Sequence, residues 1–286
     1  QESFGPDHDR LGKAIDAYRA EPSAANIAAL HLASEPRRQE LLRRLNLAPG
    51  GTHVLVRMRE SLFEAMEASP ELAAVDGDFR HLFGPWFNRG FLVLRRIDWR
   101  TPANVLEKII RYEAVHEIQG WDDLRRRLEP ADRRCFAFFH PQLIDEPLIF
   151  VEVALTGEIP RSIGEVLWGE RGVLPARAAS TAVVSSISSC QEGLRGIPFG
   201  NFLIKQVAED LKRELPNLDT FVTLSPLPGF ARWLSATVEE PGDFRMTNEE
   251  RAELARSPGE AVSLDEATRA RRDRLLGQMA AQYLLR

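Results

Sequence analysis

Apolar residues recur at helical intervals in the first part of the chain, residues 11–82. Leu41 and Leu45, for example, are one helical turn apart and therefore lie on one face of a helix. Pro or Gly interrupts this pattern at residues 21–23, 48–51 and 69–70. Because these residues end helices, the pattern predicts short helices that pack antiparallel as a bundle.

The pattern changes at residues 84–87, beyond which apolar residues alternate or run together between turn signals. We therefore place a domain boundary here, between an all-α helical bundle in residues 1–84 and a second domain in residues 85–286. Strands are predicted at residues 91–94, 135–139, 148–155, 182–189 and 220–224, and helices at residues 101–110, 121–128 and 202–215. This order predicts an α+β fold in which a mixed β-sheet is flanked by helices.

Composition and charge exclude several classes of protein. The net charge of −5 provides no basic field of the kind that holds nucleic acid. No apolar run approaches the roughly 20 residues that span a bilayer, and the N-terminus has no signal pattern. Cys135 and Cys190 lack the paired spacing of metal ligands, which predicts buried free thiols and no metal site. We therefore expect a soluble, cytoplasmic protein that binds neither nucleic acid nor a membrane.

A glycine-containing loop, residues 190–201, leaves a predicted strand and runs directly into the amphipathic helix at residues 202–215. Free backbone N–H groups and a partial positive charge face outward at such a helix N-terminus, so the loop is a candidate anion site. Gly193, Gly196 and Gly200 allow close approach of a phosphate, and Arg195 adds a charge. The loop matches neither a Walker A motif nor the dinucleotide fingerprint. A tight structural connection is therefore an equally open interpretation.

The loop resembles the diphosphate-binding loop of the acetyltransferase superfamily, with Arg195, Gly196, Gly200 and Leu203 at the places of that motif. Three segments then resemble the malonyl-CoA decarboxylase family, namely residues 146–156, 200–205 and 224–234. Weaker similarity extends over the rest of the second domain. The first domain is similar only in its helical character and its position.

The resemblance implies an acetyltransferase-like catalytic domain and assigns roles to particular residues. The coenzyme A diphosphate would bind the backbone of Arg195, Gly196, Ile197, Pro198, Phe199, Gly200 and Asn201. Pro198 has no N–H and can only shape the loop. The family's catalytic serine corresponds to Ser225, which from the residues alone we interpret as a helix N-cap ahead of Pro226. No paired base is visible, so a nucleophilic serine is not supported.

Ser185, Ser186, Ser188 and Ser189 form a hydroxyl-rich stretch of one predicted strand, which we interpret as simple strand polarity beside a turn. The resemblance also implies a histidine as the proton donor, and none of the six histidines stands at the matching position. We therefore expect that a C-terminal segment of the catalytic domain lies beyond Arg286.

The resemblance implies a carboxy-lyase that converts malonyl-CoA to acetyl-CoA and carbon dioxide without a metal or an electron-sink cofactor. Coenzyme A would be part of the substrate. The helical domain would make a homo-oligomer, a dimer or tetramer. Two alternatives stay open, an acyl-CoA-dependent N-acyltransferase and a catalytically silent module that binds coenzyme A and regulates a partner.

Overall fold

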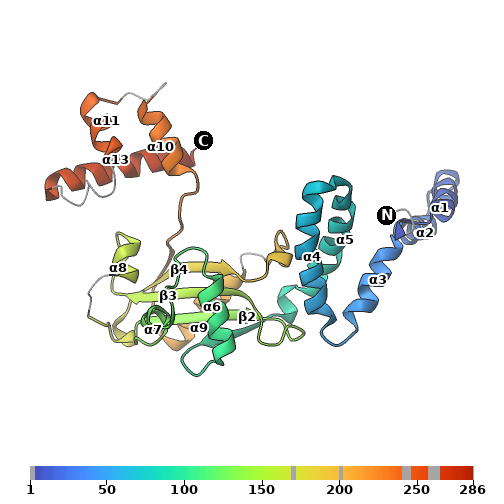
Figure 1. The fold of residues 1–286 in the computed structure, drawn as a ribbon, viewed down its shortest axis with the longest axis horizontal. Coiled ribbons are helices and arrows are strands. Elements are labelled where there is room, and N and C mark those ends of the chain that lie inside the picture. Colours follow the sequence, from blue (N-terminus) through green and yellow to red (C-terminus); the bar gives the residue numbers. More distant parts are fainter. Residues whose placement is uncertain (1–3, 169–171, 200–201, 240–245, 257–264, 286) are drawn as a thin grey trace. The chain divides into compact units, whose positions relative to one another are not determined.

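The computed structural model describes residues 4–168, 172–199, 202–239, 246–256 and 265–285. Two compact units are present, residues 1–224 and 225–286, and each is described by itself. The first unit begins with a helical region and continues into a five-stranded sheet (Figure 1). The predicted α+β class is therefore confirmed.

The helical region contains α1 (His8–Ala20), α2 (Ala24–Ser34), α3 (Arg37–Asn46), α4 (Gly51–Ala68) and α5 (Ala73–Trp86). The three predicted breaks are confirmed, and a further break at Pro36 separates α2 from α3. The Asp7 and Ser23 side chains accept hydrogen bonds at the starts of α1 and α2, as N-caps do. No residue of α1 is buried, whereas α4 and α5 contribute to the main core.

The sheet contains β1 (Val93–Ile97), β2 (Arg133–Phe139), β3 (Pro147–Thr156), β4 (Thr181–Ser189) and β5 (Thr220–Thr223), in that spatial order. The first four strands pair antiparallel, and β5 is parallel to β4, so the sheet is mixed as predicted. The first strand was expected at residues 91–94. Residues 89–91 instead form a 3₁₀ turn, in which Asn88 accepts from the Gly90 N–H, so β1 begins later.

Helices cover both faces of the sheet (Figure 1). On one face, α6 (Ala103–Tyr112) and α7 (Trp121–Leu128) pack on Ala137 and Phe150. On the other face, α9 (Phe202–Glu214) and parts of α4 and α5 share a core with Val151 and Val153. The short helix α8 (Ile163–Leu167), capped by Ser162, was not predicted, because five residues are too few to show helical periodicity. Cys135 and Cys190 are buried free thiols, as predicted.

The pairing of β4 with its two neighbours differs along its length. Its register with β3 shifts between Glu152 and Val153, and Ser185 is the extra residue of this β-bulge. On its other edge β4 pairs with β5 only from Thr181 to Val184, and the Leu224 N–H closes the ladder on the Val184 carbonyl. In the described part of the chain, residues 185–189 have no strand on that edge. β4 and β5 are therefore paired at one end and unpaired beyond Val184, and we call the point where their pairing ends the fork.

The second unit contains α10 (Phe230–Glu239), α11 (Asn248–Ala255) and α13 (Glu266–Leu284). The rings of Phe230, Trp233 and Tyr283 pack together, with centroids 5.3 to 5.9 Å apart. The Tyr283 hydroxyl donates to the Pro228 carbonyl at 2.6 Å. These contacts connect α10 to α13 at the start of the unit.

Candidate functional site

The predicted diphosphate loop directly follows the end of β4, beside the unpaired edge of that strand. Gly193 and Leu194 are the buried residues of a 3₁₀ turn, residues 192–194, and Ile197 is buried in the main core. Gly196 has φ +75°, a conformation that glycine adopts without strain. Arg195, Gly196 and Pro198 are exposed, and Phe199 packs partly against the core. Gly200 and Asn201 lie outside the described residues.

Arg195 supplies the positive charge of this loop. Its side chain is 64% exposed and pairs with Glu192 at 2.6 Å. The guanidinium also lies over the Phe63 ring, 4.3 Å from the centroid. Such an exposed pair is worth little and is readily exchanged for a stronger anion. The structure thus brings Arg195, Gly196, Ile197, Pro198 and Phe199 together in one turn, which exposes Arg195, Gly196 and Pro198 and is anchored in the core by Ile197.

Ser225 is exposed and follows Leu224, the residue that closes the β4–β5 ladder. It is not the N-cap of the next helix, since α10 begins only at Phe230. The interpretation of Ser225 as an N-cap is therefore wrong. Gly229, with φ +78°, accepts the first helical hydrogen bond from Trp233 instead. Ser225 begins the second unit, so its catalytic role stays a prediction.

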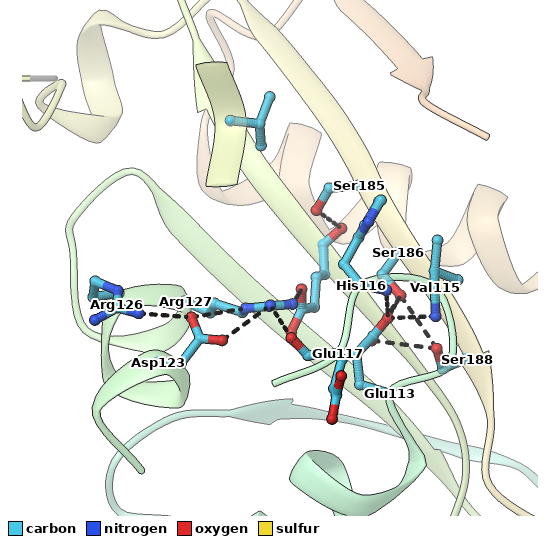
Figure 2. Close-up of polar contacts among 12 residues, drawn as sticks. Glu113, Val115, His116, Glu117, Asp123, Arg126, Arg127, Ser185, Ser186 and Ser188 are labelled. Carbon is cyan, nitrogen blue, oxygen red and sulfur yellow. Dashed lines mark hydrogen bonds and ion pairs between the residues drawn. The ribbon is translucent and has the colours of Figure 1, made fainter. Parts of the chain in front are cut away.

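A buried polar cluster covers the α6–α7 face of β3 and β4, and the sequence interpretation missed it. The Glu113 carboxylate accepts from the backbone N–H groups of Val115 and His116, at 2.9 and 2.8 Å. It also accepts from the Ser186 hydroxyl at 2.8 and 2.7 Å and from the Ser188 hydroxyl at 3.2 Å. Figure 2 shows Glu113 between the loop that carries His116 and the two serines. Simple strand polarity was therefore the wrong interpretation of Ser186 and Ser188, which are both buried.

His116 lies at the bulge of β4, where its imidazole interacts with the backbone of Ser185. Burial lowers the pKa of His116, and the nearby Glu113 carboxylate opposes this effect. The ring is therefore mainly neutral at pH 7. A neutral imidazole can donate or accept a hydrogen bond without adding a charge.

Glu152 on β3 lies beside this cluster and is almost fully buried. Its Oε2 accepts from the Arg127 guanidinium at 3.1 Å, and Arg127 also pairs with Asp123 at 3.2 Å. Glu152 Oε1 has no hydrogen-bond partner among the described residues. Burial raises the pKa of Glu152 to about 7, against the opposing effect of Arg127. A carboxyl group that holds a proton near neutral pH is thus built into the sheet.

His140, at the end of β2, has a structural role, because both of its ring nitrogens contact backbone groups. One ring nitrogen is 3.2 Å from the Trp86 carbonyl, and Nδ1 accepts from the Gln142 N–H at 3.2 Å. Nε2 therefore carries the proton. Burial lowers the pKa of His140, which favours this neutral form.

Comparison with known proteins identifies the family. The family model of the malonyl-CoA decarboxylase N-terminal domain matches residues 4–87, and that of the C-terminal domain matches residues 90–286. The chain belongs to the malonyl-CoA decarboxylase family. The resemblance that three sequence segments carried is therefore confirmed.

Individual members of the malonyl-CoA decarboxylase family show the same relationship. The mitochondrial malonyl-CoA decarboxylase of the goose Anser anser anser is 36% identical over 271 residues, which cover 88% of this chain and 54% of that protein. The mouse enzyme is 34% identical, covering 87% of this chain and 53% of its own length. The chain therefore spans about half the length of these curated relatives.

Solved structures of malonyl-CoA decarboxylases give the same fold. The enzyme of Rhodopseudomonas palustris is 56% identical with a TM-score of 0.83, over 99% of this chain and 69% of that one. The enzyme of Agrobacterium vitis is 59% identical with a TM-score of 0.84, over 95% of this chain and 66% of that one.

Across the described residues, no helix is long and apolar enough to cross a membrane.

Proposed function

We propose that the chain binds malonyl-CoA and decarboxylates it to acetyl-CoA and carbon dioxide. The observation that carries this proposal is the match of both family domains along the chain, at residues 4–87 and 90–286. The relatives are named as decarboxylases of this substrate, which supports the same activity here.

The diphosphate of coenzyme A would bind the loop from Arg195 to Asn201, and the acyl arm would run along the unpaired edge of β4. Residues 185–189 leave one strand edge free, and an extended chain with amide groups can pair with such an edge. Five residues of strand correspond to about 17 Å, at a rise of about 3.3 Å per residue. This placement would put the thioester near the fork, at Ser185 and the end of β5.

The reaction breaks the bond between the malonyl carboxylate and the α-carbon, and the electron pair stays on the thioester as an enolate. Carbon dioxide leaves, and the α-carbon then takes up a proton from water, because the histidine that the resemblance gives as the proton donor has no counterpart among the six histidines of this chain. The Ser225 hydroxyl, close in sequence to the end of β5, would donate a hydrogen bond to the carboxylate or to the enolate oxygen without a covalent step. A preorganised donor of this kind is worth about 3 to 4 kcal/mol. The proposed mechanism uses no metal or redox cofactor.

The helical region would assemble the protein as a homo-oligomer. Apolar side chains on α2, α3 and α4 are exposed in the single chain, namely Ile27, Leu32, Leu41, Leu45, Val54 and Met58. Such residues gathered on neighbouring helices are typical of subunit interfaces. A monomeric mass in light scattering at micromolar concentration would refute this part.

A cytoplasmic location stays a proposal as well, and the curated relatives are named as mitochondrial.

The activity is tested by mixing the protein with malonyl-CoA, with and without an amine acceptor, and following carbon dioxide and free thiol. Carbon dioxide without thiol supports decarboxylation. Thiol release that depends on the amine would instead identify an acyltransferase. Binding of coenzyme A with neither product would identify a silent binding module.

A further inference from the structure

Arg59, on α4 of the helical region, has a buried guanidinium, and its side chain is only 2% exposed. Burying this permanent charge is costly unless its donors are paired. Its Nε donates to Asp76 Oδ1 at 2.8 Å, which forms an ion pair with α5. Its Nη1 donates to the carbonyl oxygens of Gly193 and Arg195, at 2.8 and 2.9 Å. One side chain thus connects two helices of the first domain to the predicted diphosphate loop.

The backbone of α4 also touches this loop directly. A Cβ on Gly193 would lie 2.0 Å from the carbonyl oxygen of Val56, so only glycine fits there. Phe63 lies against both cations, with its ring centroid 4.8 Å from the Arg59 guanidinium and 4.3 Å from that of Arg195. Val56, Arg59 and Phe63 follow one another at helical spacing and therefore share one face of α4. The loop packs on that face.

The bond from Arg59 to the Arg195 carbonyl fixes the direction of the next N–H. The peptide between Arg195 and Gly196 is trans and planar, so its C=O and N–H point in opposite directions. Because the carbonyl turns toward α4, the Gly196 N–H points away from α4. None of the described residues accepts a hydrogen bond from that N–H. It is a free donor on an exposed turn, beside the exposed side chain of Arg195.

We propose that Arg59 is a positioning residue for coenzyme A binding, which holds two loop carbonyls so that the Gly196 N–H is presented to the diphosphate. This inference rests on the proposed function, because that function places the diphosphate at this loop. It gives the helical region a role in substrate binding in addition to assembly. Arg59 itself touches no substrate, and acts through the loop backbone.

The test compares Arg59→Met with Arg57→Met, using the 286-residue protein. Arg57 lies on the same helix but is 60% exposed, and its ion pair among the described residues is with Glu60, so it is a matched control. Calorimetry measures the affinity for coenzyme A, and competition measures the affinity for pantetheine, which has no diphosphate. Arg59→Met should weaken coenzyme A binding by about tenfold to a hundredfold, the value of one or two hydrogen bonds, and leave pantetheine binding unchanged. Arg57→Met should change neither affinity.

Four results would overturn the proposal. Unchanged coenzyme A affinity in Arg59→Met, or an equal loss for both ligands, would show that Arg59 supports the fold and not the diphosphate loop. If Arg59→Met does not fold, Arg59→Lys decides the question, since it keeps the charge but cannot hold both carbonyls and Asp76 together. Wild-type affinity in Arg59→Lys would refute positioning. Failure of the wild-type protein to bind coenzyme A would instead refute the proposed function, and this inference with it.

Discussion

Arg127 and Glu152 form an ion pair at 3.1 Å in which each side chain is only 5% exposed. Arg127 is shared with Asp123, which is 8% exposed, so one buried cation faces two buried carboxylates. A buried pair of charges is stable only if the remaining donors and acceptors are also satisfied. Glu152 Oε1 has no hydrogen-bond partner among the residues that the structure describes. Glu152 is therefore the group of this cluster in which a proton is most easily held.

The first prediction concerns the pH dependence of stability. The pKa of Glu152 is raised by burial from 4.5 to about 7 in the folded protein, and returns to its ordinary value on unfolding. Between pH 4.5 and about 7 the folded state holds a proton on Glu152 that the unfolded state releases. The free energy of unfolding therefore falls as the pH rises through this range, and the stability that this proton contributes is lost above it.

Glu152→Gln cannot titrate and should remove this decline. Urea unfolding at several pH values between 4.5 and about 7 measures the effect. The difference in stability between the wild type and the variant isolates Glu152, because every other titratable group is present in both proteins. A difference that does not change with pH would show that Glu152 is ionised in the fold throughout.

The second prediction is that Arg127→Met destabilises the protein by about 3–5 kcal/mol, because it leaves the buried Glu152 carboxylate without its cation and Asp123 with only the exposed Arg126. Arg126→Met is the matched control. Arg126 also pairs with Asp123, at 3.2 Å, but it is 65% exposed. Its loss should cost about 0–1 kcal/mol. Equal costs for the two variants in urea unfolding would contradict the role given to burial.

The third prediction concerns the contact between α4 and the loop. Gly193→Ala places a Cβ 2.0 Å from the Val56 carbonyl oxygen, so the loop must move away from α4. Coenzyme A affinity should fall about tenfold, since the loop backbone is displaced from its binding geometry. Gly157→Ala is a control, because nothing lies within 4 Å of the added Cβ. Calorimetry on both variants checks this, and normal affinity in Gly193→Ala would refute the close approach.

Local patterns predicted the order of the main elements well. The helix at residues 121–128 has the predicted bounds, and the buried stripe of α9 contains Leu203, Val207 and Leu211 as its amphipathic pattern indicates. Both of these features depend on residues within a few positions of each other. The loop after β4 was found in the same way, because glycines before an amphipathic helix are a local signal.

The buried polar contacts could not be found from local patterns. Glu113 meets Ser186 and Ser188 across 73 and 75 positions of sequence, and Arg59 meets the Gly193 carbonyl across 134. An arginine within a helix is usually solvated, so the sequence gives no sign that Arg59 is buried. One signal was available for the serines. Ser186 and Ser188 alternate on one face of a strand that begins with the apolar run Ala182–Val184, which indicates a polar partner on that face.

The last prediction separates the two roles considered for Ser225. The structure excludes an N-cap of α10, because that helix begins at Phe230. Ser225→Ala should therefore leave the free energy of unfolding within about 0.5 kcal/mol of the wild type, as exposed surface substitutions do. If the hydroxyl contacts the reacting malonyl group, turnover should fall by about 10²-fold to 10³-fold, the usual loss for one donor to a developing oxyanion.

Coenzyme A affinity should be unchanged in Ser225→Ala, since the diphosphate loop is intact. Ser235→Ala is the matched control, because Ser235 is also exposed in the second unit and lies on α10. Carbon dioxide release from malonyl-CoA gives the rate, and calorimetry gives the affinity. A Ser225→Ala protein that releases carbon dioxide at the wild-type rate would remove Ser225 from the catalytic site. A parallel loss of rate and of coenzyme A affinity would instead assign Ser225 to binding, since an interaction made only in the transition state lowers the rate alone.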